Sequence, residues 1–189
     1  MMKRRRNKRF RHFHLGRPWC EAIELDDGRQ FILRPMQITD APTLRRSFAR
    51  LTPEEVRLRF LHPIKELTVV YSNRLATIDV DREFALVLVE NAHPDVALIG
   101  AVARAAIDAT DRKAEFAIIV GHEIGQHGLG HYLLSKLVEW TRKKGLDAIY
   151  GHVLRDNRPM LKLARDLKFR TIETEEDDDI YLMQRDFNR

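Results

Sequence analysis

Hydrophobic and polar positions along this chain follow two periods, and each change of period marks a different predicted element. Apolar residues from 41 to 51 recur at helical spacing after an N-cap candidate at residues 39–40, and they predict a first helix. Thr52 and Glu55 have the spacing of a capping box, with a proline between them, and predict the start of a second helix. Residues 67–78 have an ambiguous pattern, for which we expect a helix.

Strand patterns fill the middle of the chain. Residues 84–89, 96–107 and 113–120 are rich in β-branched and small apolar side chains and are separated by polar turns. This texture predicts a meander of three strands. An earlier hairpin is predicted for residues 22–25 and 30–34, because the Asp-Gly pair between them tolerates the positive φ of a tight turn.

The last third of the chain alternates strands and helices. A glycine-rich loop over residues 121–130 leads into an amphipathic helix. We expect this helix to end before Gly145, because the cations at residues 142–144 and the glycine after them are typical of a helix C-terminus. A strand over residues 148–154, a helix capped by Asn157 and two final strands complete the order. Together these elements predict an α/β fold.

Composition fits one globular domain. The chain has 189 residues, 44% of them hydrophobic, which suits a single core and is too apolar for a disordered protein. Its one cysteine, Cys20, cannot form an internal disulfide, so we expect a cytoplasmic protein. The apolar stretches are too short to cross a membrane, and no apolar segment follows the basic start of the chain, so we expect neither a membrane span nor a secretory signal.

The charge is distributed unevenly. Residues 1–20 hold eight lysines and arginines and no acid, whereas the rest of the chain holds 25 of the 33 bases and all 28 acids, a net charge of −3. We therefore divide the chain into a basic arm, residues 1–19, and a domain, residues 20–189. The arm could bind nucleic acid or another anionic partner, and its interleaved aromatic residues could stack on bases. We expect it to be a solvated extension whose removal leaves the stability unchanged.

Candidate chemistry is concentrated in residues 120–132 (VGHEIGQHGLGHY), a strand end, a loop with three glycines and a helix start. Glycines let a backbone approach a ligand closely, and the amides of a first helical turn bind phosphate. His127 and His131 could add donors. A glycine-rich turn that binds nothing is the structural alternative.

Two other interpretations of this segment fit poorly. A dinucleotide fold needs a G-x-G-x-x-G spacing early in a βαβ unit, whereas a meander precedes this loop. A zinc-protease helix needs histidines four residues apart, but His127 lies five residues after His122, and the glycines between and after them would disrupt the helix. We expect no metal site.

Several shorter motifs narrow the interpretation. The strand, loop, helix and strand are followed by Asn-Arg-Pro-Met at residues 157–160, and the earlier chain contains residues 57–60 (RLRF), 81–85 (DREFA) and 114–117 (AEFA). Over residues 31–187 this pattern resembles the GNAT superfamily of acetyl-CoA-dependent N-acetyltransferases. The short motifs are similar to the acetyltransferase domain of bacterial protein-lysine acetyltransferases. The resemblance implies a GNAT fold, a mixed central β-sheet flanked by helices, with splayed central strands.

The same resemblance implies which residues bind acetyl-CoA. The backbone of Ile118, Ile119 and Val120 would pair with the pantetheine arm, and Asn157 would contact the cofactor where the central strands splay. The pyrophosphate would be held by the loop and helix start, namely Gly125, Gln126, His127, Gly128, Leu129, Gly130 and His131.

The chain departs from the family pattern at two functional positions. Gly125 stands where the family usually has a glutamine or arginine, and Ala164 stands where many members have a tyrosine that protonates the departing thiolate. The first change removes a side-chain contact to pyrophosphate or reroutes it, and the second removes the usual acid.

An amine acceptor needs a base, because a lysine with a pKa of about 10.4 is neutral in on the order of one molecule in a thousand at pH 7. The resemblance places Glu115 at the position of the family's general base, on the strand that enters the loop. Glu83, Asp111 and Glu123 are weaker candidates.

We therefore predict an N-acetyltransferase that uses acetyl-CoA and whose favoured acceptor is a protein lysine. An acetyltransferase for small-molecule amines and an acyl-CoA sensor without catalysis are the alternatives, and the arm leaves open a nucleic-acid-binding module.

Overall fold

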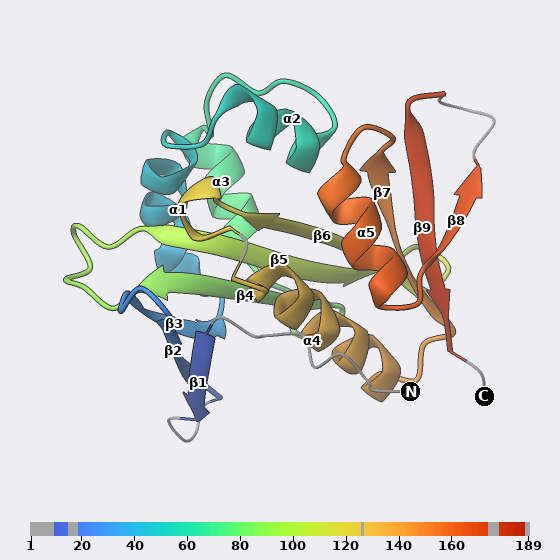
Figure 1. The fold of residues 1–189 in the computed structure, drawn as a ribbon, viewed down its shortest axis with the longest axis horizontal. Coiled ribbons are helices and arrows are strands. Elements are labelled where there is room, and N and C mark those ends of the chain that lie inside the picture. The colour runs from blue at the N-terminus through green and yellow to red at the C-terminus, as the bar shows by residue number, and fades with distance from the viewer. Residues whose placement is uncertain (1–9, 15–18, 126, 174–177, 188–189) are drawn as a thin grey trace.

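The computed structural model describes residues 10–14, 19–125, 127–173 and 178–187. Within this part of the chain nine strands form one sheet, in the order β1-β2-β3-β4-β5-β6-β7-β9-β8 (Figure 1). The strands are β1 Phe10–His14, β2 Glu21–Leu25, β3 Gln30–Pro35, β4 Glu83–Glu90, β5 Ile99–Ile107, β6 Lys113–Val120, β7 Ala148–Leu154, β8 Arg170–Glu173 and β9 Ile180–Asp186. The helices are α1 Ala41–Phe48, α2 Pro53–Phe60, α3 Val69–Ala76, α4 Leu129–Lys143 and α5 Arg158–Asp166, with short 3₁₀ turns at Ile38–Asp40 and His122–Ile124.

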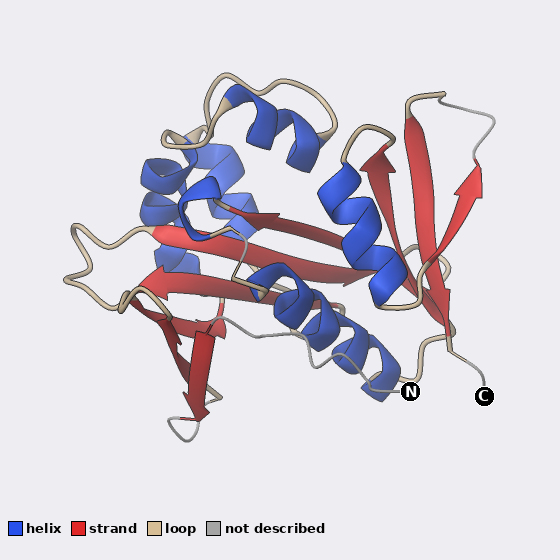
Figure 2. Ribbon diagram, viewed as in Figure 1, coloured by secondary structure: helices blue, strands red, loops and turns tan. Residues whose placement is uncertain are grey.

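The sheet is mixed and the helices cover both of its faces (Figure 2). Neighbouring strands are antiparallel except β6 and β7, which are parallel. The predicted hairpin, meander and strand–helix alternation are all confirmed, and residues 67–78 contain the helix α3. No helix in the described part of the chain is long and apolar enough to span a membrane.

Alternating side chains of the central strands pack into two hydrophobic cores, one on each face of the sheet. On β4, Leu86 and Leu88 face the larger core with α4 and α5, whereas Ala85 and Val87 face a second core with α1, α2 and α3. This alternation is the period of two expected for a strand buried on both faces. The sheet therefore forms a rigid wall between two groups of helices.

The capping signals in the sequence mark the observed helix starts. Thr52 Oγ1 accepts a hydrogen bond from Glu55 N at 3.1 Å, and Glu55 Oε2 accepts one from Thr52 N at 2.7 Å. Asn157 Oδ1 accepts from Met160 N at 3.1 Å at the start of α5. These bonds satisfy backbone donors that have no partner within the helix, and they fix where α2 and α5 begin.

The expectation of a solvated arm is wrong for residues 10–14. They form β1, which pairs with β2 in antiparallel register, Phe10 opposite Leu25. Phe10 is only 6% exposed, and its ring lies 5.3 Å from that of Tyr132 on α4. The apolar partner lies far away in the sequence, so the arm itself gave no sign of it. Residues 1–9 and 15–18 of the arm lie outside the described residues.

The two central parallel strands separate, as the resemblance implied. β6 pairs with β7 only through Lys113, Ala114 and Glu115, although β6 continues to Val120 and β7 to Leu154. On its other edge β7 pairs with β9 along its whole length. The backbone of β6 beyond Glu115 therefore presents a strand edge to the gap rather than to a neighbouring strand.

Candidate functional site

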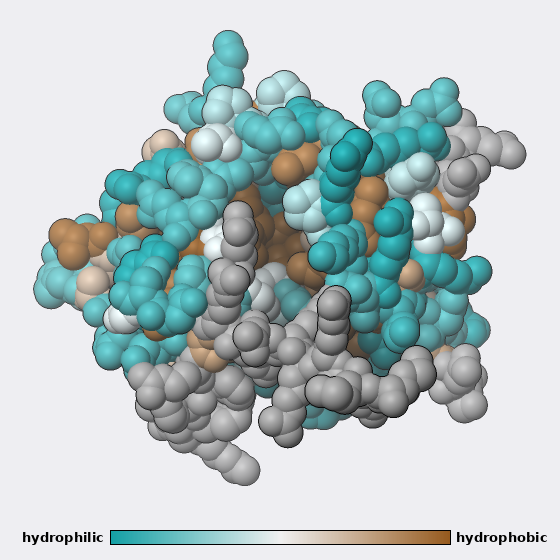
Figure 3. Space-filling view, in the orientation of Figure 1, coloured by the Kyte–Doolittle hydropathy of each residue, from teal (hydrophilic) through white to brown (hydrophobic). Residues whose placement is uncertain are grey.

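A cleft of about 870 Å³ opens where β6 and β7 separate. It is lined by α2, β6, the loop that leads into α4, β7 and α5 along its length. Figure 3 shows the molecule hollowed there, with hydrophobic residues at the bottom and hydrophilic residues around the rim. A large, mostly apolar cleft with a few polar groups is the usual form of a ligand site.

One wall of the cleft is the free edge of β6. Ile118, Ile119 and Val120 all line the cleft and are half-buried. Their side chains alternate, because Ile118 and Val120 pack against the larger core while Ile119 faces α1–α3. An extended ligand could add to this edge as a further strand does.

The second wall is the glycine-rich loop with the start of α4. Gly125, Gly128, Leu129, Gly130 and His131 line the cleft, and Gln126 lies outside the described residues. The first intrahelical donor of α4 is Tyr132 N, which bonds the carbonyl of Gly128 at 3.1 Å. The amides that precede it are therefore the first-turn donors that bind phosphate at helix N-termini, where the helix dipole adds positive potential.

Two glycines make this helix start. Gly128 has φ of 85°, in the left-handed region that side chains with a Cβ rarely adopt. A Cβ on Gly130 would lie 2.8 Å from the Leu163 side chain of α5 and 3.9 Å from Val120 of β6. Gly128 is thus favoured by the turn, whereas a side chain at position 130 would make the end of the Leu163 side chain shift.

His127 does not line the cleft. Its Nδ1 lies 2.7 Å from the carboxylate of Asp26, so the loop is tied to the β2–β3 turn. Among the described residues, ligand atoms of His127, Asp26 and Asp27 lie within 4.8 Å of one another, but both acids are exposed and Asp27 is paired with Arg29. This cluster lies at the turn and not in the cleft.

Glu115 stands at the vertex where the central strands separate. Its Oε1 lies 2.9 Å from His152 Nδ1, and both side chains line the cleft. They are partly solvated, with Glu115 49% and His152 39% exposed. The hydrogen bond to Glu115 raises the pKa of His152 above its usual value. A carboxylate and an imidazole in contact can accept and hold a proton at this point.

His152 was missed by sequence reasoning. The residue opposite Glu115 in the β6–β7 register is Tyr150, and His152 follows it two positions later on the same face of β7. Its only signal in the sequence is a polar residue at alternate spacing in the strand predicted for residues 148–154. Without the register between β6 and β7, nothing linked it to Glu115.

The weaker base candidates are engaged elsewhere. Glu83 pairs with Arg104, Asp111 with Arg82, and Glu123 with Arg50. None of these three carboxylates lines the cleft. The structure therefore brings only Glu115, of the four predicted acids, to the point where the strands separate.

Helix α2 is held across the cleft by one ion pair and by hydrogen bonds between Glu55 and His122. Arg57 lies 2.7 Å from Asp156, in the turn before α5, and Glu55 accepts from the backbone and ring of His122 at 2.6 and 3.1 Å. The same turn carries Asn157, which lines the cleft and uses its side-chain oxygen to cap α5. Ala164 is fully buried in α5, and its methyl side chain has no proton to donate.

Several known proteins are similar to this chain in sequence or in fold. A curated protein of Pseudomonas aeruginosa, "Acetyltransferase PA5475", is 29% identical over 154 residues, which is 82% of this chain and 81% of that protein. The solved GNAT domain of S. lividans PAT superposes with a TM-score of 0.76 at 21% identity, over 88% of this chain and 96% of that one. A putative acetyltransferase from Salmonella typhimurium, solved with its cofactor acetyl-CoA, gives 0.64 at 16% identity, over 84% and 95% of the two chains.

At these identities the two solved structures support the fold alone, a mixed sheet flanked by helices. The sequence model of one family, "Acetyltransferase (GNAT) domain", matches residues 30–170. This range includes every residue that lines the cleft. The chain belongs to the acetyltransferase (GNAT) domain family.

Proposed function

We propose that this acetyl-CoA-dependent N-acetyltransferase transfers the acetyl group directly to an amine held beside Glu115, and that the favoured amine is a protein lysine. The observation that carries the proposal is the contact of Glu115 with His152 at the vertex of the separated strands, 2.9 Å between Oε1 and Nδ1. It gives an acid–base group at the end of a cleft large enough for an extended ligand.

Acetyl-CoA supplies the thioester, and the chain supplies the groups that hold it. The edge of β6 at residues 118–120 would pair with the pantetheine arm, which leads the thioester toward Glu115. The first-turn amides of α4, at residues 128–131, would bind the pyrophosphate. Asn157 would contact the cofactor from the start of α5. Gly125 contributes backbone but no side chain, so binding would depend on amides more than in relatives with a glutamine or arginine there.

The acceptor must lose a proton before it attacks. Glu115 would accept that proton, directly or through one water, and His152 would hold the carboxylate in place through Nδ1. The hydrogen bond to Glu115 raises the pKa of His152, so this imidazole is more often protonated at neutral pH than an ordinary histidine.

The choice of a protein lysine rests on the motifs at residues 57–60, 81–85 and 114–117, which resemble those of bacterial protein-lysine acetyltransferases. We also place the reaction in the cytoplasm, since one cysteine in 189 residues is typical of a reducing compartment.

Calorimetry and a thiol-release screen test the proposal. We expect acetyl-CoA and CoA to bind the wild-type protein, and lysine peptides to release CoA thiol faster than small amines do. Faster release with small amines would reassign the acceptor. Binding without release for any amine would favour a sensor, and a lack of acetyl-CoA binding would contradict the proposal as a whole.

A further inference from the structure

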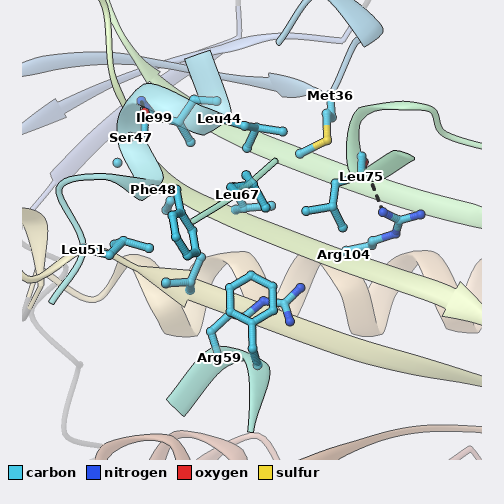
Figure 4. A pocket seen from close by; sticks show the side chains of 16 residues that line it. Met36, Leu44, Ser47, Phe48, Leu51, Arg59, Leu67, Leu75, Ile99 and Arg104 are labelled. Carbon is cyan, nitrogen blue, oxygen red and sulfur yellow. Dashed lines mark hydrogen bonds between the residues drawn. The ribbon is translucent and has the colours of Figure 1, made fainter. Parts of the chain in front are cut away.

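Arg59 has no carboxylate in contact with its guanidinium in the part of the chain that the structure describes. It lies in the last turn of α2 and points toward the sheet (Figure 4). Among the described residues its guanidinium has no hydrogen-bond acceptor and no ion-pair partner; its contact is the ring of Phe60, with Cζ 4.9 Å from the centroid. The side chain is partly buried, and this burial lowers the pKa of Arg59.

Neighbouring arginines behave differently. Arg57, two residues earlier on α2, contacts the carboxylates of Glu54 and Asp156, each at 2.7 Å. Arg104, across the same cavity in Figure 4, donates to the carbonyl of Leu75 at 3.1 Å and pairs with Glu83. Within the described part of the chain, these two guanidinium groups thus have partners and Arg59 has none.

Arg59 stands where two spaces meet. One is the cleft that contains Glu115, and the other is an apolar cavity of about 70 Å³ enclosed by α1, α2, α3 and β5. Arg59, Phe60 and Ile119 line both spaces. Ile119 shares a face of β6 with Glu115, and the charge of Glu115 acts on Arg59. Arg59 therefore lines the same cleft as the proposed base.

A cation in this position costs free energy until an anion contacts it. Neither bound reactant of the proposed reaction supplies a lasting one, because the thioester end of acetyl-CoA is neutral, its phosphates belong at the start of α4, and a lysine acceptor is itself cationic. The planar fork of arginine matches a carboxylate with two parallel hydrogen bonds. Among the described residues nothing occupies the hydrogen-bond donors of the Arg59 guanidinium, which lines the cleft.

We infer that Arg59 binds a carboxylate carried by one of the two reacting molecules. The carboxylate is either the far end of a dicarboxylic acyl group on CoA or a group next to the amine of the acceptor. This inference rests on the proposed function and specifies the substrate class of the same site. It predicts that the enzyme distinguishes molecules of equal length by a terminal carboxylate.

The first experiment tests the acyl source by calorimetry, which needs no acceptor. Butyryl-CoA and succinyl-CoA both carry four-carbon acyl groups and differ in a methyl against a carboxylate. If the acyl group is the source, succinyl-CoA binds the wild type at least tenfold more tightly than butyryl-CoA, as expected for a charged bidentate contact. Arg59→Met removes this preference, and Arg59→Lys restores part of it.

The second experiment tests the acceptor source by thiol release from acetyl-CoA. The pairs are 4-aminobutanoate against butylamine, and a lysine peptide with a neighbouring glutamate against the same peptide with glutamine. If the acceptor is the source, the carboxylated member of at least one pair has a KM at least tenfold lower in the wild type and not in Arg59→Met. Arg74→Met is the matched control for both experiments, because Arg74 is exposed on the adjacent helix α3.

The outcomes separate three cases. A preference in either experiment that Arg59→Met abolishes and Arg74→Met keeps supports the inference and identifies the source. No such preference in either, with CoA still bound, overturns the inference alone, whereas loss of CoA binding by the wild type overturns the proposed function and this inference with it. Melting temperature adds a check, since removing an unpaired, partly buried charge should not lower it, and a fall of several degrees in Arg59→Met would show a structural role instead.

Discussion

Glu21 and Arg59 are charged residues on opposite faces of the sheet, and they differ in whether other side chains pair with them. Glu21 on β2 is fully buried, accepts a hydrogen bond from the hydroxyl of Tyr132, and lies 3.4 Å from the ammonium of Lys136. Burial, and then that hydrogen bond, raise the pKa of Tyr132, so the phenol stays protonated as the donor. Arg59, at the junction of the cleft and the apolar cavity, has no such partner among the described residues.

This difference separates a charged group that stabilises the fold from charged groups that remain available to a ligand. Under β1 and β2, a buried charge is neutralised by the chain itself, and the cluster joins β2 to α4. In the cleft, a cation and the partly solvated Glu115–His152 pair are left accessible to what binds there. Unpaired charge and open strand edges cost stability and are kept at functional sites.

The largest expected effect belongs to the cleft. Glu115→Gln keeps the shape of the side chain but removes proton acceptance, so turnover on a confirmed acceptor should fall by roughly 10²–10⁴-fold. Acetyl-CoA affinity and melting temperature should be unchanged, and the defect should shrink at high pH, where more of the amine is already neutral. Steady-state thiol release between pH 7 and 10 measures this.

Glu123→Gln is the control for that experiment, because Glu123 is paired with Arg50 and lies outside the cleft. It should have nearly normal turnover. Wild-type turnover for Glu115→Gln at pH 7, with chemistry rate-limiting, would eliminate Glu115 as the base and leave the family assignment intact.

The next effect concerns the other side of the sheet. Phe10→Ala should lower the free energy of unfolding by about 3 kcal/mol, since it removes a buried aromatic ring packed on Tyr132. Urea denaturation followed by far-UV circular dichroism measures the loss. A change under about 0.5 kcal/mol would restore the original expectation that the arm is a solvated extension.

Much of the fold was predictable because its signals are local. The capping residues Thr52 and Asn157 and the turn glycine at 28 report on backbone within a few positions, and the structure places a helix or turn at each. β1 was missed because Phe10 is buried by Tyr132, 122 positions along the chain. No periodicity within the arm carries that contact.

The candidate site divides in the same way. The glycine loop, the edge of β6 and Glu115 were found from motifs, because each is a continuous segment. His152 depends on the β6–β7 register, and the exposure of Arg59 to the cleft depends on how α2 packs over β6. Both arise from tertiary packing, which a single sequence does not specify residue by residue.

A smaller effect tests the buried cluster of Glu21, Tyr132 and Lys136. Lys136→Met removes the cation beside the buried Glu21 and should destabilise the fold by about 2 kcal/mol, less than the full loss of a buried ion pair because the bond from Tyr132 is kept. The matched control is Lys143→Met on the same helix, whose pair with Glu139 is exposed and should contribute under about 0.5 kcal/mol. Equal effects for the two variants, measured by urea denaturation, would contradict the contrast between the cluster and the surface.

The smallest expected effect is the pH dependence caused by His152. Its pKa in the folded protein is raised above the ordinary value of 6.5, first by the hydrogen bond to Glu115. A raised histidine pKa stabilises the fold fully below the unfolded value, and this contribution is lost as the pH rises through the folded value. Because the side chain is 39% exposed, solvent screening limits this stability contribution to roughly a few tenths of a kcal/mol, so the pKa is best measured on His152 itself.

NMR titration of His152 should give a pKa above 6.5 in the wild type and a lower one in Glu115→Gln, which keeps the shape but not the charge. An unchanged pKa in that variant would mean that Glu115 does not hold the imidazole, and the proton would then have to be accepted without the pair.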